Sequence, residues 1–413
     1  MPLSTRIDEL LGDRVGRLSH WGGPNVPIAS PRSESEVLAL LDAARADGLA
    51  VLPIGNGTKL DHALIPTRVD LALSTRRLTG IVAYEPAEGV LTARAGTSLR
   101  VLRETVAAHG HHFSPEVPHE DRATLGGVVS AAPSGADRLR HGPVRDRVLG
   151  VRLARTDGRV VRSGGALVKD VAGYDLQRLV VGAHGSLGVV LEVSIRLASA
   201  ADERVLVRRR LASVDEGLEL ARALAAALHA SLRALRIDGD PERPWLTVDI
   251  EGRAAVVERS LARAHDVLGP VHVLRDAGAK RVADELRESR RLGGRWPQLE
   301  IDALPSRFGA ALAAVRNEVR DAKLSVELHP ALGLGWVRFA HTPGRAGAHT
   351  LARALRAAGA TSRWCGLDAE VRRELVEAAG PPAGLALMER LRRAFDPTDT
   401  LATPRLHPEL GPS

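Results

Sequence analysis

Short apolar runs, amphipathic helices and glycine-containing turns alternate through about the first 200 residues. Val37, Leu40 and Leu41 form the apolar stripe of a helix predicted over 34–48, with Ser33 able to cap its start and Gly48 able to end it. Apolar runs of strand length are separated by turn residues, and the last pair flanks an Asp-Gly turn typical of a β-hairpin. The predicted strands are 49–54, 69–73, 81–84, 89–95, 148–155, 160–163 and 189–197, with a second helix over 99–108. This mixture predicts an α+β domain that has glycines at its loop tips.

A different order of elements begins near residue 201. The pattern predicts strand 204–211, helix 213–228, strands 232–238 and 245–251, helix 254–267 and strand 271–274. This β-α-β-β-α-β sequence is the ferredoxin-like order. After a helix at 278–291, a similar round follows as strand 299–304, helix 306–319, strands 323–328 and 334–340, helix 346–358 and strand 361–364. Both a duplicated unit and one wide antiparallel sheet with helices on one face fit this pattern.

Composition narrows the class of protein. The chain has 413 residues and a formal net charge of +7, but its arginines are spread along the whole length, whereas nucleic acid binding favours a coherent basic patch. Cys365 is the only cysteine, which excludes an internal disulfide and a cysteine-ligated iron–sulfur cluster. The amino terminus lacks the apolar core of a secretory signal, and no apolar run approaches the length of about 18 residues that a membrane span needs. We therefore expect a cytoplasmic protein without nucleic acid as a partner.

Three glycine-rich segments are the most informative part of the chain. They read Pro-Ile-Gly-Asn-Gly-Thr-Lys at 53–59, Thr-Leu-Gly-Gly-Val-Val-Ser-Ala-Ala-Pro-Ser-Gly at 124–135, and Lys-Asp-Val-Ala-Gly-Tyr-Asp-Leu at 169–176 followed by Gly-Ala-His-Gly-Ser-Leu-Gly at 182–188. Glycines at such places allow sharp turns and close approach to a ligand, and they free N–H groups to face an anion. Three such loops in order predict one extended, phosphate-bearing cofactor. The first loop lacks the Gly-Lys-Ser/Thr end of a Walker A motif and the spacing of a dinucleotide-binding Rossmann loop.

In their order and content, these motifs resemble the vanillyl-alcohol-oxidase type of FAD-binding domain, also called PCMH-type. Within that family the set is most similar to the FAD-binding subunit of bacterial glycolate oxidase (GlcE type). The resemblance covers about residues 25–198 and returns at Phe395-Asp-Pro397. It implies a PCMH-type FAD-binding domain followed by an antiparallel-sheet, ferredoxin-like cap domain. The expected boundaries are an amino-terminal segment at 1–26, the FAD-binding domain at 27–198, the cap at 201–364, and carboxyl-terminal helices and a tail at 365–413.

The resemblance also implies which residues contact FAD. The first loop would bind the pyrophosphate, with Lys59 as its positive charge, and the other two would line the rest of the cofactor. The expected set is Ile54, Gly55, Asn56, Gly57, Thr58, Lys59, Pro115, Thr124, Leu125, Gly126, Gly127, Ser130, Ser134, Gly135, Gly185, Leu187, Gly188 and Val190. Thr58 stands where covalently flavinylated relatives tend to carry histidine, so the expected FAD is non-covalent. Two arginines in the second loop region, Arg138 and Arg140, suit either phosphate neutralisation or a solvated surface.

The chain departs from the family in the segment expected to carry catalysis. Relatives that oxidise 2-hydroxy acids have a His-x-Gly-Asp-Gly-Asn-x-His-like segment, whereas 327–339 keeps His329 but lacks the Asp-Gly-Asn core and the second histidine. His329 is therefore only a weak candidate for a general base, and the catalytic residues stay unassigned. The tail at 400–405 also departs from the Asn-Pro-Gly-Arg sequence of relatives. His109, His111 and His112 have no partner at a metal-ligand spacing, so we expect a solvated turn and no metal.

These features predict an FAD-binding subunit of a glycolate-oxidase-like complex. It would act on a 2-hydroxy acid such as glycolate and pass electrons to a sister flavoprotein and an iron–sulfur subunit, since this chain lacks cluster cysteines. The complex could lie at the periphery of the inner membrane. Two alternatives stay open: a free-standing FAD-dependent oxidoreductase of another alcohol or hydroxy acid, and a non-catalytic flavin-binding scaffold.

Overall fold

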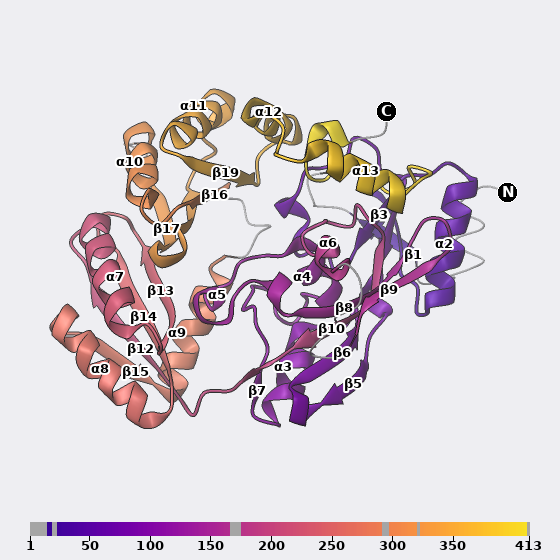
Figure 1. Cartoon of the computed structure of the whole chain (residues 1–413). Coiled ribbons are helices and arrows are strands. Elements are labelled where there is room, and N and C mark those ends of the chain that lie inside the picture. Colours follow the sequence, from indigo (N-terminus) through magenta and orange to yellow (C-terminus); the bar gives the residue numbers. More distant parts are fainter. Residues whose placement is uncertain (1–14, 19–22, 166–174, 291–296, 320–322, 411–413) are drawn as a thin grey trace.

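The computed structural model describes residues 15–18, 23–165, 175–290, 297–319 and 323–410. Its first half contains a small mostly parallel sheet and a five-stranded antiparallel sheet, and its second half contains one wide antiparallel sheet. Figure 1 shows the wide sheet and its helices standing beside the first half, with the last helices returning over that half. The predicted α+β class and the antiparallel, ferredoxin-like second part are confirmed.

The small sheet begins the chain and has the order β1-β2-β4-β3. Its strands are β1 (Val15–Leu18), β2 (Val26–Ala29), β3 (Val51–Ile54) and β4 (Leu71–Ser74). The last three run parallel, and β1 pairs antiparallel with β2. Helix α2 (Glu34–Ala46) packs its apolar stripe on this sheet, and the Ser33 side chain accepts a hydrogen bond from the Glu36 N–H at its start, as predicted. The parallel arrangement places the carboxyl ends of β3 and β4 side by side.

The five-stranded sheet has the order β5-β6-β10-β8-β9 and is antiparallel throughout. Its strands are β5 (Ile81–Glu85), β6 (Val90–Arg94), β8 (Val148–Ala154), β9 (Val160–Gly164) and β10 (Val189–Arg196). The β8–β9 hairpin and helix α3 (Leu99–Ala107) lie where the sequence pattern predicted them. The pattern did not predict the short helices α4 (Leu125–Ala131), α5 (Arg138–His141) and α6 (Gln177–Val180) or the two-stranded pair β7 (His111–His112) and β11 (Ala198–Ser199).

The second half is one eight-stranded sheet made of two ferredoxin-like units joined edge to edge. The order is β15-β12-β14-β13-β17-β18-β16-β19, and β13 joins the two units by pairing with β17. The strands are β12 (Glu203–Arg210), β13 (Leu232–Gly239), β14 (Trp245–Gly252), β15 (His272–Arg275), β16 (Gln298–Ala303), β17 (Leu324–His329), β18 (Leu334–Phe339) and β19 (Ala360–Cys365). Both alternatives left open by the sequence therefore describe it: the unit is duplicated, and the sheet is continuous.

The two faces of this sheet differ in chemistry, because strand residues alternate between them. One face is apolar and packs with helices α7 (Val214–Leu228), α8 (Ala254–Leu268), α10 (Phe308–Glu318) and α11 (Gly344–Ala357) in the largest hydrophobic core. The other face carries buried charged residues, including Arg233, Asp249 and Glu327. Helix α9 (Asp276–Glu288) lies on this second face, where it packs on Leu206. The charged face is the one in contact with the first half, since Arg233 there pairs with Glu116 at 2.8 Å.

The end of the chain returns to the first half after α12 (Ala369–Ala379) and α13 (Leu385–Phe395), as Figure 1 shows. Asp396 accepts a hydrogen bond from the Thr156 hydroxyl at 2.8 Å, and Val51 bonds to the backbone of Thr400 and Ala402 at 2.7 Å each. This contact brings the tail beside β3. None of the helices in the described ranges combines the length and the apolar character needed to cross a membrane.

Candidate functional site

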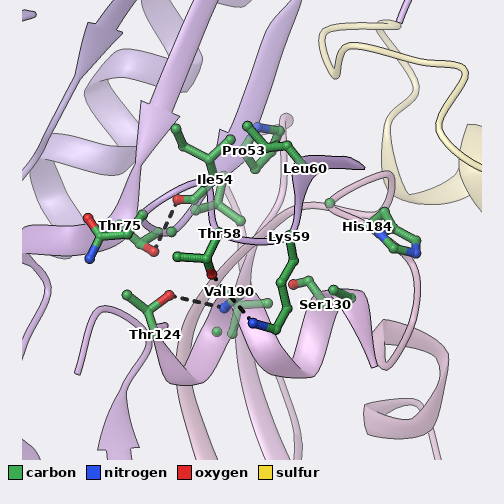
Figure 2. A pocket seen from close by; sticks show the side chains of 18 of the residues that line it. Pro53, Ile54, Thr58, Lys59, Leu60, Thr75, Thr124, Ser130, His184 and Val190 are labelled. Atoms are coloured by element: carbon green, nitrogen blue, oxygen red, sulfur yellow. Dashed lines mark hydrogen bonds between the residues drawn. The ribbon is translucent and has the colours of Figure 1, made fainter. Parts of the chain in front are cut away.

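The three glycine-rich segments converge on one pocket (Figure 2). The loop after β3, the start of α4 and the loop before β10 each supply a wall. Most of the predicted cofactor residues line it, namely Ile54, Gly55, Asn56, Gly57, Thr58, Lys59, Thr124, Gly126, Gly127, Ser130, Gly185, Gly188 and Val190. The structure therefore brings together residues up to about 140 positions apart at the tips of neighbouring elements.

Close backbone packing explains the glycines in the first two loops. A Cβ at position 55 would overlap Thr124 Oγ1, and a Cβ at position 126 would lie 2.7 Å from Ala95 Cβ. Thr124 Oγ1 caps α4 by accepting a hydrogen bond from the Gly127 N–H at 3.3 Å. The loops can approach each other this closely only because the glycines have no side chains.

Lys59 places a buried positive charge in this pocket. Its side chain extends toward α4, near Ser130 and Thr124 (Figure 2), and its residue is 7% exposed. Within the described ranges, no carboxylate lies at ion-pair distance from its Nζ, and its one hydrogen bond is a long contact to Thr58 Oγ1 at 3.5 Å. Burial, with a smaller contribution from nearby Arg290, lowers the pKa of Lys59 to about 7. A buried amine in this state is suited to pair with an anionic group of a ligand.

Five of the predicted cofactor residues do not line this pocket. Leu125 and Leu187 are buried in the hydrophobic core between the five-stranded sheet and α3. The Pro115 carbonyl accepts from Arg103 of α3 at 2.6 Å, and the Ser134 carbonyl accepts from Arg290 of the cap at 2.8 Å. A Cβ on Gly135 would lie 2.5 Å from the Glu116 carbonyl oxygen, so this glycine serves the contact between two loops. Their assignment as cofactor contacts stays a prediction.

The pocket also has lining residues that the sequence did not indicate. They are Pro53, Leu60, Thr75, Ala131, His184, Val189 and Arg405. Pro53, Leu60, Ala131 and Val189 each adjoin a predicted residue, and Pro53 and Ala131 lie within the glycine-rich segments 53–59 and 124–135. Thr75 follows the parallel neighbour of β3, and its hydroxyl donates to the Ile54 carbonyl at 3.3 Å. Arg405 comes from the far end of the chain, and the only signal for it was its place in the altered tail motif at 400–405.

Charged residues from the cap lie close to the Lys59 side of the pocket. Arg290 follows α9, interacts electrostatically with Lys59, and lies with its Nε 3.3 Å from Glu327 Oε1. Glu327 Oε1 is also 2.9 Å from His329 Nε2 at the end of β17, and both side chains are buried. The His329 ring lies edge-on to Trp336 at 5.4 Å between centroids. His329, the weak candidate for a base, therefore belongs to a buried cluster on the cap face, although it does not line the glycine-rich pocket itself.

The other residues singled out in the sequence have separate surroundings. His111 Nδ1 lies 2.8 Å from the Tyr84 hydroxyl, whereas His112 Nε2 lies 3.5 Å from Asp137 Oδ2. Arg138 donates to the Ser134 hydroxyl at 2.6 Å, and Arg140 pairs with Glu251 at 2.7 Å. In the part of the chain that the structure describes, no group of three or more histidine, cysteine or acidic side chains could hold a metal ion. The segment 169–174 of the third motif lies outside the described residues.

The pocket fits the diphosphate of a dinucleotide cofactor. Its glycine-rich walls allow close backbone approach, and its buried lysine has no carboxylate at ion-pair distance among the described residues, Glu288 acting only from further away. Backbone N–H groups and one lysine together are a common means of holding a phosphate group. Lys59 would neutralise part of the negative charge of the diphosphate.

We expect Lys59→Met to weaken FAD binding by about tenfold to a hundredfold at pH 7, the range for loss of one charge-assisted hydrogen bond. A bound anion favours the protonated form of the lysine. At a pH at which the lysine of the apoprotein is neutral, FAD binding must therefore be accompanied by uptake of a proton. Because the pKa of the free lysine is lowered to about 7, the affinity of the parent for FAD should fall as the pH rises from 7 to 9, by up to about tenfold per unit. Fluorescence titration of the apoprotein with FAD at several pH values measures both effects.

Lys280→Met is the matched control, because Lys280 is an exposed lysine on α9. It should leave both the affinity and its pH dependence as in the parent. Equal FAD affinities for the Lys59 and Lys280 variants would contradict a role of Lys59 at the cofactor.

Comparison with known proteins gives the same cofactor. Residues 27–164 match the family model described as FAD binding domain. The chain is 39% identical to glycolate oxidase subunit GlcE of Escherichia coli over 150 residues, which are 36% of this chain and 43% of that protein. It is 32% identical to a D-lactate dehydrogenase of Archaeoglobus fulgidus over 173 residues, which are 42% of this chain and 39% of that protein.

A solved structure of alkyldihydroxyacetonephosphate synthase has a similar fold, with a TM-score of 0.70 and 14% identity, over 93% of this chain and 78% of that one. At this identity the likeness concerns the fold alone. The chain spans less than half of the length of the two curated relatives named above. The family match and the geometry of the pocket together assign the cofactor: residues 27–164 are a PCMH-type FAD-binding domain, and its cofactor is FAD.

Proposed function

We propose that this chain is the FAD-binding subunit of a 2-hydroxy-acid dehydrogenase complex of the glycolate-oxidase kind. FAD, when bound, supplies the acceptor for a hydride equivalent from the substrate carbon. The observation that carries the proposal is the glycine-rich FAD pocket beside a buried cap cluster of Arg290, Glu327 and His329. The relatives named GlcE and D-lactate dehydrogenase support the substrate class. Electrons would leave through a sister flavoprotein and an iron–sulfur subunit.

The cap cluster has the charges that a hydroxy acid requires. Arg290 and the fully buried Arg236 supply two guanidinium groups on this face of the sheet. Within the described residues, Arg236 Nε and Arg290 Nη2 have no hydrogen-bond partner. A substrate carboxylate is a natural partner for such donors, because guanidinium groups bind carboxylates with charge-assisted hydrogen bonds. These arginines would orient the substrate.

The Glu327–His329 pair favours a second candidate, an enzyme that oxidises its substrate without a partner subunit. Burial favours the neutral carboxyl, yet Arg290 and His329 outweigh it and hold the pKa of Glu327 at about 2. Burial lowers the pKa of His329, so the imidazole is neutral at pH 7. A carboxylate facing Nε2 favours the tautomer with the proton there, which leaves Nδ1 able to accept a proton. Nδ1 is buried and has no hydrogen-bond partner among the described residues. This is the state expected of a general base before substrate binds.

Reduction of an artificial dye with glycolate or D-lactate tests both candidates. The purified, FAD-loaded chain is compared with the same chain co-produced with the products of neighbouring genes. We expect slow turnover by the chain alone and fast turnover by the complex, with His329→Gln leaving the complex unaffected. Fast turnover by the chain alone that falls about 10²–10⁴-fold in His329→Gln, the contribution of a general base, would contradict the subunit proposal and support the second candidate.

His349→Gln is the control for this experiment. His349 also lies beside a glutamate, with its Nε2 3.2 Å from Glu374 Oε2, but it is half-exposed on α11. This variant should turn over like the parent in either preparation. The absence of turnover in every preparation that retains FAD would contradict the proposed substrate class while leaving the cofactor assignment intact.

A further inference from the structure

A second cavity adjoins the flavin pocket and is lined by basic side chains. It has a volume of about 390 Å³ and lies between the segment 62–64 after β3, strand β19, helix α12 and the tail at 405–407. It shares only His184 and Arg405 with the flavin pocket. Four arginines line it, and none of the described lining residues is a carboxylate. We infer that this cavity binds a small organic dianion, a phosphate monoester or a dicarboxylate, in addition to FAD.

Arg405 is the central cation of the cavity. It is 3% exposed, and its described hydrogen bonds go to the neutral carbonyls of Leu60 and Leu64. Its Nε is buried and has no hydrogen-bond partner in the described ranges. Burial, together with the charge of Arg372, lowers the pKa of Arg405 to about 9. A guanidinium whose ionisation is disfavoured in this way lies in a positive environment that an anion would relieve.

The other cations are only partly neutralised. Arg372 donates to the carbonyls of Asp61 and Ala63, and its Nη1 is 3.9 Å from Asp61 Oδ1. Arg363 pairs with Glu300 at 2.5 Å. Arg356, on the exposed side of α11, has no described ion pair and lines the cavity. Asp302 also acts on Arg363, but Arg356 and Arg405 have no carboxylate at ion-pair distance among the described residues, and two such cations suit a dianion.

Buried ring nitrogens without partners come from three further places. Trp364 Nε1 on β19, His407 Nε2 in the tail and His62 Nδ1 are each buried without a hydrogen-bond partner among the described residues. Such groups are costly unless something binds to them. All three residues line the cavity. Their convergence on one cavity is the second observation that indicates a ligand.

The remaining wall indicates an organic ligand. Leu375, Val376, Ala379, Pro382 and Leu406 add apolar side chains to the lining. An anionic group bound by the arginines would leave a short carbon chain against these side chains. The ligand is distinct from the flavin diphosphate, because that group has its own lysine and glycine loops in the adjoining pocket.

The test is isothermal titration of the FAD-loaded full chain with inorganic phosphate, and separately with malonate, at constant ionic strength in a buffer without other multivalent anions. We expect one saturable site for at least one probe. If phosphate binds more tightly than malonate, the ligand is a phosphate ester. If malonate binds more tightly than phosphate, the ligand is a dicarboxylate. If neither probe binds saturably, the inference is overturned. It is also overturned if FAD displaces phosphate from the apoprotein.

Two variants localise the site. Trp364→Phe removes the Nε1–H and keeps an aromatic ring to stack on Phe339, which lies 5.3 Å away between centroids, so we expect about fivefold to tenfold weaker binding. Arg356→Gln removes an exposed cation without disturbing a buried contact and should weaken binding about threefold. Trp245→Phe and Arg316→Gln are the controls, since neither residue lines the cavity. If both test variants bind the probe with the same affinity as the parent, the inference is overturned. Because Arg356 is exposed, its variant keeps the test valid even if Trp364→Phe folds poorly.

Discussion

Replacing Arg233 by methionine is expected to destabilise the protein by about 3–5 kcal/mol, the cost of leaving buried carboxylates without their cation. Arg233 on β13 is 1% exposed. Its guanidinium lies 2.8 Å from Glu116, 2.9 Å from Glu251 and 3.1 Å from Asp249. Glu116 belongs to the first half of the chain, whereas Asp249 and Glu251 lie on β14 of the cap sheet. The substitution therefore removes the most buried of the charges that join the two halves, while Arg140–Glu251 and Arg204–Glu116 remain.

The loss should depend on pH in a defined direction. Burial alone would raise the pKa of Glu116, but Arg233 and Arg204 outweigh it and hold this pKa well below its usual range. The pKa values of Asp249 and Glu251 are likewise lowered. Groups with a lowered folded pKa contribute stability above their unfolded pKa, near 4, and this contribution is lost as the pH falls through the folded value. In the variant burial raises the pKa values of these carboxylates and they protonate more easily, so its deficit against the parent should be smaller at pH 4 than at pH 7.5.

Urea unfolding followed by circular dichroism at pH 7.5 and at pH 4 measures this difference. Arg222→Met is the matched control, because Arg222 is an exposed arginine on α7 whose one described hydrogen bond, at 3.4 Å, goes to its own helix. It should change the unfolding free energy by no more than about 0.5 kcal/mol. An Arg233 variant as stable as the Arg222 variant at pH 7.5 would show that the buried network contributes no net stability.

The sequence predicted the ferredoxin-like part well because its strands largely alternate between apolar and polar residues, with one register shift in β13 between Leu232 and Ala234. In β13, Leu235 and Ile237 enter the helix-covered core, while Arg233 and Arg236 occupy the other face. A polar strand face normally indicates solvent, so the pattern could not show that this face is buried against another part of the chain. The charge network therefore escaped prediction, although its cap residues Arg233, Asp249 and Glu251 lie in correctly predicted strands.

The FAD pocket was predictable to the extent that local glycine geometry determines it. Gly55 and Gly126 occur where two loops touch, and such positions are visible in the sequence as glycine at a strand or helix end. Leu125, predicted with them, lies in the hydrophobic core, because on a helix the next residue points about 100° away; its contact with the cofactor stays a prediction. Arg405 depends on the return of the tail to β3, a contact between residues more than 340 positions apart that no local pattern contains.

The last prediction concerns Gly127, in the first turn of α4, where we expect Gly127→Val to abolish FAD binding while the cap stays folded. Its backbone is ordinary helix, so the effect comes from space and not from a strained φ. A Cβ there would lie 3.0 Å from Thr124 Oγ1, the atom that caps the helix, and the methyl groups of valine would extend further toward the pocket. Valine therefore both displaces the cap and fills the space where the backbone should approach the cofactor.

The measurement is the ratio of flavin to protein, from the visible absorbance of the purified variant and from the flavin released into the supernatant by acid precipitation. In the parent, release on precipitation is expected because Thr58 offers no imidazole for a covalent bond. Gly347→Val is the matched control: it lies in α11 of the cap, and its Cβ would be at an ordinary 3.5 Å from Pro343 Cβ. That variant should gain a little helix propensity, by about 0.5 kcal/mol or less, and keep its flavin. Because α4 contributes nothing to the cap core, the thermal transition of the cap should persist in the Gly127 variant. If the Gly127 variant carries as much FAD as the parent, α4 does not form a wall of the cofactor pocket.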